Sequence, residues 1–158
     1  MANKKIKVIG LISDTHGLIR PQALEALRKV DLIIHAGDIG KPEVIKTLKS
    51  IAPVIAIKGN NDTQGWAKKF PAVRSVRDNQ ANIYVIHNIK ELAFDPARRG
   101  FHAVISGHSH KPLISKRDAV LFVNPGSAGP RRFKLPVAVA KLRVTEQSIE
   151  AEIIELDV

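Results

Sequence analysis

The amino-acid sequence predicts an α/β fold in which two β-sheets pack face to face, with helices on their outer sides. Three observations lead to this class. Short apolar runs alternate with amphipathic segments in the first half, turns separate short apolar runs in the second half, and 44% of the 158 residues are hydrophobic. A chain of this length and apolar content buries enough surface to fold without disulfides, and we expect residues 1–158 to form one domain.

The first half alternates between strand and helix. Apolar runs typical of buried strands occupy residues 5–12, 32–35 and 54–57. Helices are predicted over residues 21–29 and 42–50, and each begins with a proline, which is favoured at the first helical position. Leu24 and Leu27 share one face of the first helix, as Val44 and Leu48 do in the second. This order predicts parallel strands joined by right-handed crossovers.

The second half is richer in strands. We expect strands at residues 73–77 and 82–86 around a turn at Asp78 and Asn79, a short helix over residues 89–99, and a strand at residues 103–106. Two hairpins follow, one over residues 113–116 and 120–123 and the other over residues 137–144 and 149–156. Two sheets packed face to face would bury all of these apolar runs.

Composition narrows the class of protein. The chain contains no cysteine, which excludes disulfides, iron–sulfur clusters and thiolate metal sites and fits a reducing cytoplasm. The apolar run that follows the N-terminal lysines is short and is ended by Asp14, so it predicts a strand instead of a signal peptide. No apolar stretch approaches the length of a membrane span. We therefore expect a cytoplasmic protein without a membrane partner.

The net charge of +10 favours ligands that carry phosphate. The basic residues are spread along the chain, and the one tight cluster is Arg131, Arg132 and Lys134. Aromatic residues make up 4% of the chain, too few for a platform on which single-stranded bases stack. A small phosphate ester is thus the favoured substrate, and nuclease activity is kept as a weaker alternative.

Seven residues that can bind metal lie at or just past the ends of five predicted strands. They are Asp14, His16, Asp38, Asn60, His87, His108 and His110. In open α/β sheets the C-terminal ends of the strands form the ligand-binding edge. Each motif alone has an ordinary explanation, such as a turn aspartate or a histidine in the core. Their shared position at the strand ends is what predicts a metal centre.

The spacing and chemistry of these residues support the same prediction. Asp14 and His16 are two positions apart, as are His108 and His110, and in extended chain such pairs point to the same side. We therefore expect two pairs of converging side chains. Carboxylate, imidazole and amide groups without sulfur suit manganese, iron, nickel, zinc or cobalt better than copper(I).

At these positions the chain resembles the calcineurin-like metallophosphoesterase superfamily, whose motifs run D-x-H, G-D, G-N, H and G-H-x-H. The matching residues here are Asp14 and His16, Gly37 and Asp38, Gly59 and Asn60, His87, and Gly107, His108 and His110. Residues 59–62 and 124–127 resemble the small bacterial and archaeal phosphodiesterase branch, which shares its fold with the phosphodiesterase-like subunit of retromer. The resemblance implies a four-layer αββα sandwich.

The resemblance also implies a role for each residue. The first metal is expected on Asp14, His16 and His110, and the second on Asn60, His87 and His108, with Asp38 as the bridge between them; Asp38, Asn60 and His108 are also expected to act in catalysis. The cofactors would be two divalent ions, first of all Mn²⁺, with Ni²⁺, Fe²⁺, Co²⁺ and Zn²⁺ as alternatives. A hydroxide bridging the ions would attack phosphorus. The expected activity is a phosphodiesterase or phosphatase acting on small or activated esters, in a protein that the family resemblance also makes a candidate homodimer.

Two positions depart from the family pattern. Asn61 stands where many members have a histidine, the proposed general acid, and an amide cannot donate a proton as an acid does. We therefore predict a preference for activated leaving groups. Asn88 and Ile89 follow His87 in place of glycine and histidine and are expected to narrow the approach to the metal. These departures keep open a non-catalytic scaffold with the same fold.

Residues near the motifs carry further expectations. His35 is expected to lie in the core or behind a ligand, and Asp62 is expected either to orient a ligand imidazole or to lie in an exposed loop. Residues 124–127 predict a tight turn near the site, whose amides, with Arg131, are candidates to contact substrate phosphate. Trp66 is a candidate pocket wall or interface residue.

Overall fold

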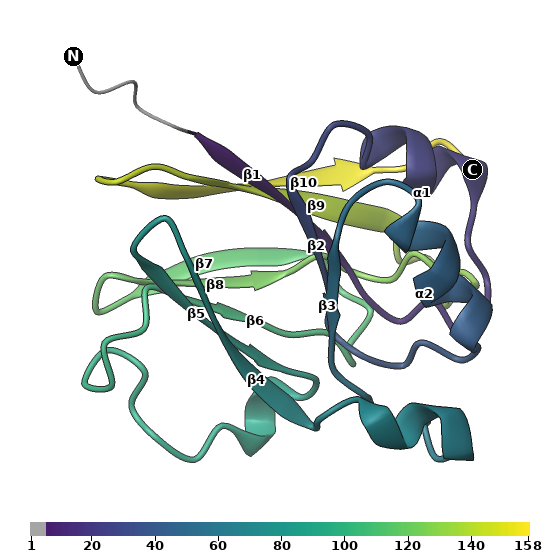
Figure 1. Cartoon of the computed structure of the whole chain (residues 1–158), viewed down its shortest axis with the longest axis horizontal. Helices are drawn as coiled ribbons and strands as arrows, with labels where there is room; N and C mark the ends of the chain where they lie inside the picture. Colours follow the sequence, from purple (N-terminus) through teal and green to yellow (C-terminus); the bar gives the residue numbers. More distant parts are fainter. Residues whose placement is uncertain (1–5) are drawn as a thin grey trace.

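The first sheet contains the parallel strands predicted for the first half of the chain. The computed structural model describes residues 6–158, so residue 5 of the predicted strand 5–12 lies outside the described part. Strands β1 (Lys7–Ile12), β2 (Leu32–His35) and β3 (Val54–Ala56) pair in parallel. Strand β9 (Ala138–Val144) runs antiparallel to β1, and β10 (Ile149–Glu155) completes the order β10-β9-β1-β2-β3 (Figure 1).

The second sheet has the order β4-β5-β6-β8-β7. Its strands are β4 (Val73–Asp78), β5 (Ala81–Ile86), β6 (Ala103–Ile105), β7 (Leu113–Arg117) and β8 (Val120–Asn124). The three central strands are parallel, whereas β4 and β7 are antiparallel edges. The prediction of an α/β fold with two face-to-face sheets is therefore confirmed.

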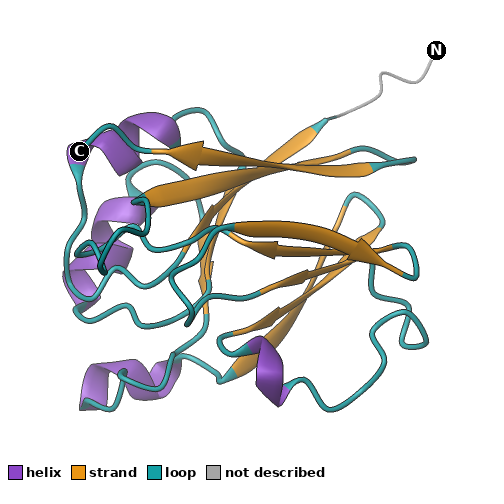
Figure 2. Cartoon of the chain, turned by 180° about the vertical axis from the view of Figure 1, so that it is seen from behind, coloured by secondary structure: helices purple, strands orange, loops and turns teal. Residues whose placement is uncertain are grey.

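Two apolar clusters hold the layers together. The cluster between the sheets contains Leu11, Ile34, Ile83 and Ile105, each fully buried. Helices α1 (Pro21–Ala26) and α2 (Pro42–Lys49) pack against the first sheet through a second cluster (Figure 2). Within the described part of the chain, no helix is long and apolar enough to cross a membrane.

The outer face of the second sheet is covered mainly by a loop. A 3-10 turn, η2 (Ile89–Glu91), begins this segment, and the helix predicted over residues 89–99 is wrong beyond that turn. Pro96 explains the difference, because proline removes a helical hydrogen bond and disfavours helical geometry at the residue before it. The loop instead places Leu92 and Ala97 against Phe122 on the sheet.

Two further differences lie in the first half. Helix α1 ends at Ala26 and not at residue 29, because Lys29 adopts a left-handed φ of 68° that a helix cannot contain. A 3-10 helix, η1 (Gly65–Lys69), forms where no element was predicted. Its Trp66 meets Phe70 edge-to-face and packs against the apolar cluster of α1 and α2, so it serves packing on the helix side of the first sheet.

Candidate metal centre

Loops from both sheets meet at the C-terminal ends of their parallel strands. The loop after β1 is tied to the loop after β2, because the Asp14 amide donates to the Gly37 carbonyl at 2.9 Å. In the second sheet the Gly107 amide donates to the His87 carbonyl, also at 2.9 Å. The His108 amide crosses between the sheets and donates to Asp14 Oδ2 at 3.0 Å. The predicted convergence of loops from both sheets is therefore present.

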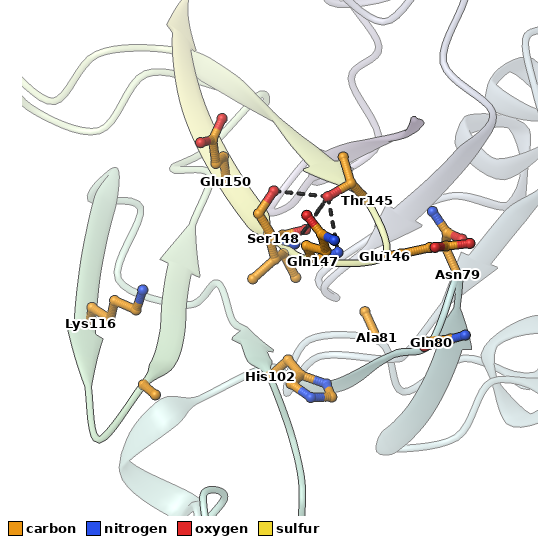
Figure 3. Close-up of a pocket in the computed structure, with 12 residues that line it drawn as sticks. Asn79, Gln80, Ala81, His102, Lys116, Thr145, Glu146, Gln147, Ser148 and Glu150 are labelled. Carbon is orange, nitrogen blue, oxygen red and sulfur yellow. Dashed lines mark hydrogen bonds between the residues drawn. The ribbon is translucent and has the colours of Figure 1, made fainter. Parts of the chain in front are cut away.

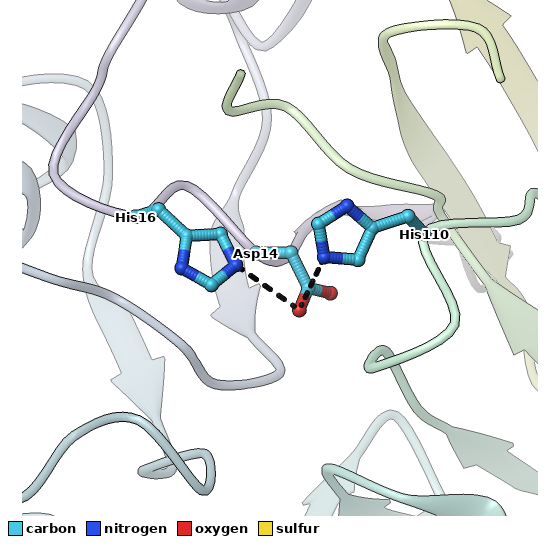
Figure 4. Close-up of side chains that lie close together, drawn as sticks. All are labelled: Asp14, His16 and His110. Carbon is cyan, nitrogen blue, oxygen red and sulfur yellow. Dashed lines mark ion pairs between the residues drawn. The ribbon is translucent and has the colours of Figure 1, made fainter. Parts of the chain in front are cut away.

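Asp14, His16 and His110 form a first group of side chains that could hold a metal ion. Their candidate ligand atoms lie within 4.8 Å of one another. Asp14 Oδ1 is 3.4 Å from His110 Nε2 and 3.9 Å from His16 Nε2 (Figure 4). The group joins the loop after β1 to the loop after β6.

Asp14, Asp38 and His87 form a second such group. His87 Nε2 lies 3.3 Å from Asp38 Oδ2 and 3.8 Å from Asp14 Oδ1. Asp38 Oδ2 is also 3.7 Å from His16 Nε2, a member of the first group. The two groups thus overlap at Asp14, and Asp38 faces an imidazole from each.

The polar atoms of the centre are arranged for a cation. Asp14 Oδ1 and His87 Nε2 are buried and have no hydrogen-bond partner among residues 6–158, although ion-pair neighbours surround both. A buried carboxylate oxygen and a buried imidazole nitrogen without such partners are costly, and a divalent cation between them removes that cost. The oxygen and nitrogen atoms present therefore fit a metal ion of the borderline kind.

Hydrogen bonds determine which oxygen of Asp14 faces the centre. Oδ2 accepts from the Ser13 hydroxyl at 2.7 Å and from the His108 amide at 3.0 Å, which leaves Oδ1 for the centre. Burial raises the pKa of Asp14, but the His110 imidazole and the Ser13 hydroxyl outweigh it, so the pKa lies below its usual 3.8. The carboxylate is therefore ionised at neutral pH.

Asp38 is held at both oxygens by Asn61. The Asn61 backbone amide donates to Oδ1 at 2.9 Å, and its side-chain amide donates to Oδ2 at 3.1 Å. Burial raises the pKa of Asp38, but contact with His87 and the Asn61 amide outweigh it and bring the pKa to about 2. Asn61 thus supports a charged side chain of the centre.

The orientation of His87 follows from a bond on its far side. Its Nδ1 lies 2.7 Å from the Ala36 carbonyl, an acceptor, so Nδ1 carries the proton and Nε2 points its lone pair at the centre. Burial lowers the pKa of His87, but the neighbouring Asp38 carboxylate outweighs it and raises the pKa above 6.5. A metal ion would compete directly with that added proton.

Asn60 and His108 lie beside these two groups and belong to neither. With His87 they line a cavity of about 310 Å³, and the His87 and His108 rings are 5.3 Å apart between centroids. Both Asn60 and His108 are exposed. The structure thus brings all seven predicted residues to one region, with five of them in the two groups.

The expectation of extended backbone in the two pairs is wrong, although Asp14 and His16 do converge in the first group. Asp14, His16, Asp38, His108 and His110 all have left-handed backbone, with φ between 47° and 70°. The chain therefore turns within each pair, and His110 belongs to the first group whereas His108 lies beside His87. Such backbone is uncommon outside glycine and concentrates at functional sites.

Comparison with known proteins supports the family that the motifs indicate. The sequence profile of the calcineurin-like phosphoesterase superfamily domain matches residues 8–147. The chain belongs to this superfamily. A probable metallophosphoesterase from Methanothermobacter thermautotrophicus is 33% identical, over 93% of this chain and 91% of that protein.

Solved structures also resemble this chain. An archaeal phosphodiesterase is 26% identical, with a TM-score of 0.76 over 93% of this chain and 99% of that one. Vacuolar protein sorting 29 from Cryptosporidium parvum also has a TM-score of 0.76, over 96% and 98% of the two chains. At 18% identity the latter likeness concerns the fold alone.

Asp62 neither orients a ligand imidazole nor lies exposed in a loop, the two roles expected from the sequence. Only 5% of its surface is exposed, and it contacts backbone amides instead of an imidazole. Its carboxylate accepts from Ile39 and Gly40 at 3.0 Å and from Gly59 at 2.9 Å. Asp62 therefore joins the loop that carries Asp38 to the loop that carries Asn60.

The turn at residues 124–127 is buried and forms hydrogen bonds with the loops that carry the centre. The Asn124 side chain donates to the Gly107 carbonyl at 2.9 Å, and the Ser127 hydroxyl donates to the Asp14 carbonyl at 3.0 Å. The Gly126 amide is bonded to Asn124, so it is not free for phosphate. Arg131 donates to the Val158 carbonyl at 3.2 Å, and its contact with substrate phosphate stays a prediction.

His35 is fully buried behind the centre, as predicted. Its Nδ1 accepts from the Gly37 amide at 3.1 Å, so the proton must lie on Nε2, which donates to Thr15 Oγ1 at 2.9 Å. The Thr15 hydroxyl in turn donates to the Ile39 carbonyl at 2.8 Å. Burial lowers the pKa of His35 to about 4, and the neutral ring satisfies every polar atom of this chain of bonds.

Another cavity lies at the opposite end of the sandwich. It measures about 420 Å³ and is lined by the β4–β5 and β9–β10 turns, together with His102 and Lys116 (Figure 3). Lys7, at the start of β1, pairs with Val144 beside this cavity, whereas the centre follows the other end of β1. None of the seven predicted residues lines it. Cavity size alone therefore does not identify the candidate site.

Proposed function

We propose that this protein is a metal-dependent phosphodiesterase that hydrolyses small or activated phosphate esters. Its cofactors would be two divalent metal ions, with Mn²⁺ as the preferred ion. The observation that supports the proposal is Asp14 Oδ1, which has no hydrogen-bond partner among residues 6–158 and lies in two groups of candidate ligands at once. The absence of cysteine fits a reducing compartment, and we place the reaction in the cytoplasm.

The proposed ligands divide between two neighbouring positions. Asp14, His16 and His110 would hold the first ion, and Asn60, His87 and His108 the second, with Asp38 between them. His87 presents its Nε2 because the Ala36 carbonyl holds Nδ1. Divalent ions in such sites supply a nucleophile at neutral pH and neutralise charge on the phosphoryl oxygens.

Asn61 bears on which leaving groups the site can release. Asn61 carries no acidic proton, and its side-chain amide is already engaged with Asp38 Oδ2. It therefore contributes to the position of Asp38 and not to protonation of the leaving oxygen. We accordingly expect faster hydrolysis of nitrophenyl esters than of alkyl esters, since a nitrophenolate leaves without a proton.

Metal reconstitution tests this proposal. The purified chain is stripped of metal and assayed on nitrophenyl phosphate and bis-nitrophenyl phosphate with Mn²⁺, Ni²⁺, Co²⁺, Zn²⁺ or Mg²⁺. We expect metal-dependent turnover that Asp38→Ala abolishes and that Glu43→Ala, an exposed change on α2, leaves intact. Turnover that survives in Asp38→Ala would contradict the site, and no turnover under any condition would contradict the enzyme.

The alternative is a non-catalytic scaffold that keeps the metal for structure. Asn61 and Asn88 favour it, because both side chains bond within the protein, Asn61 to Asp38 and Asn88 to the Lys90 amide. Calorimetric titration of the stripped chain with Mn²⁺ separates the two functions. Tight binding without turnover on either ester would support the scaffold.

A further inference from the structure

The cavity of about 310 Å³ beside the centre has two chemically different sides. One side consists of Asn60, His87 and His108, which we propose as ligands of the second ion. The other side is formed by residues outside the family motifs. A group esterified to a phosphate at the centre would extend into this space.

The side away from the centre combines an apolar wall with one cation. Ala72, Val73 and Ile86 provide the wall, and Val73 is 40% exposed at the mouth. Lys58 also lines the cavity and is half-buried. Among residues 6–158 its ammonium group has neither an ion-pair partner nor a hydrogen-bond acceptor, so it is available to an anionic ligand.

Glu91 is the one acidic residue of the lining. It lies on η2, is exposed, and does not approach Lys58 closely enough to form an ion pair. Solvent screens an exposed carboxylate strongly, whereas the charge of a partly buried side chain is screened less. The electrostatic preference of the cavity is therefore set by Lys58.

We propose that this cavity is a subsite for the organic group of the substrate, and that Lys58 selects groups that carry a second anion. The inference rests on the proposed phosphodiesterase function. The volume is at the lower end for ligand pockets, so the group is compact, about the size of one substituted ring. Its apolar part contacts Val73 and Ile86, and its carboxylate or second phosphate meets the Lys58 ammonium group.

Direct binding tests the subsite without requiring catalysis. The Mn²⁺-loaded protein is titrated in a calorimeter with benzylphosphonate carrying a para-carboxylate, and separately with the para-methyl compound. We expect the carboxylate to bind about tenfold more tightly, the effect of one charge-assisted contact. Lys58→Met, which keeps the length and apolar stem, should reduce the ratio to about one.

Two matched variants separate a local contact from the general field of the protein. Lys90→Met removes the same charge from an exposed neighbour that does not line the cavity, and it should keep most of the tenfold preference. Glu91→Gln removes the opposing charge and should raise the preference slightly. Circular dichroism confirms that each variant is folded before titration.

The outcomes for the subsite and for the enzyme are distinct. Equal binding of the two phosphonates by the parent protein, or an undiminished preference in folded Lys58→Met, would overturn the subsite. Equal losses in Lys58→Met and Lys90→Met would also overturn it. If the preference depends on Lys58 but no ester is hydrolysed, the subsite stands and the proposed enzymatic function fails.

Discussion

The buried imidazole of His35 predicts a specific loss of stability in mild acid. The neutral ring accepts from the Gly37 amide and donates to Thr15. A second proton would go to Nδ1, which already faces the Gly37 N–H. Protonation would thus set two donors against each other inside a fully buried site.

The magnitude follows from the difference in pKa between the two states. Burial lowers the pKa of His35 from 6.5 to about 4 in the folded protein, while the unfolded chain keeps the usual value. Between these pH values the unfolded state binds more protons, so the free energy of unfolding falls as the pH falls. A difference of about 2.5 pH units corresponds to about 3 kcal/mol, present above pH 6.5 and lost on reaching pH 4.

Urea unfolding of the metal-free protein at pH 7, 6, 5 and 4 measures this loss. The controls are His35→Asn, which keeps an acceptor for Gly37, and His35→Gln, which keeps a donor for Thr15. Both replacements are non-titrating, while every other acidic and basic group is retained. We expect the parent to lose about 3 kcal/mol more than either variant between pH 7 and pH 4.

The comparison isolates His35 because the other groups of the centre titrate in all three proteins. If the stability of parent and variants falls in parallel with pH, His35 is not held neutral and the reasoning about its tautomer is wrong. A larger loss in the variants than in the parent would show that His35 gains a proton in the folded state.

Three further predictions concern the loops of the centre. Asp62→Ala should lower the free energy of unfolding by about 3 kcal/mol in urea titrations, because three backbone amides lose a charged acceptor, and Asp62→Asn should cost less. Gly107→Ala should cost roughly 1–3 kcal/mol and weaken Mn²⁺ binding in calorimetry, since the added Cβ would collide with Ser13 and Asp14, whereas Gly65→Ala meets nothing and should be nearly neutral. Mn²⁺ at a hundredfold excess over its dissociation constant should stabilise the parent by about 2.7 kcal/mol, and chelation or Asp14→Ala should remove this gain in thermal unfolding.

The sequence predicted the succession of strands along the chain and the edge at which polar residues gather. Apolar periodicity and strand length are local properties, so the βαβαβ unit and both hairpins could be recognised from them. The helix expected over residues 89–99 failed because the apolar spacing was followed past Pro96. The buried turn at residues 124–127 was expected at the site but not as its support, since its partners Gly107 and Asp14 are distant in sequence.

Asn61 shows that the role of a residue depends on its hydrogen-bond partners as well as on its type. From sequence, Asn61 indicates a lost acid, because an amide cannot perform the chemistry of the histidine common at that position. In the structure the same side chain donates to Asp38, a residue 23 positions away, whose ionisation the centre requires. A histidine at position 61 would offer an acidic proton but would replace this amide donor with an imidazole, so the loss of an acid and the support of a carboxylate are consequences of one residue. We therefore expect Asn61→Ala, which removes only the side-chain donor, to weaken metal binding, and unchanged Mn²⁺ affinity of that variant in calorimetry would show that Asp38 does not need the Asn61 side chain.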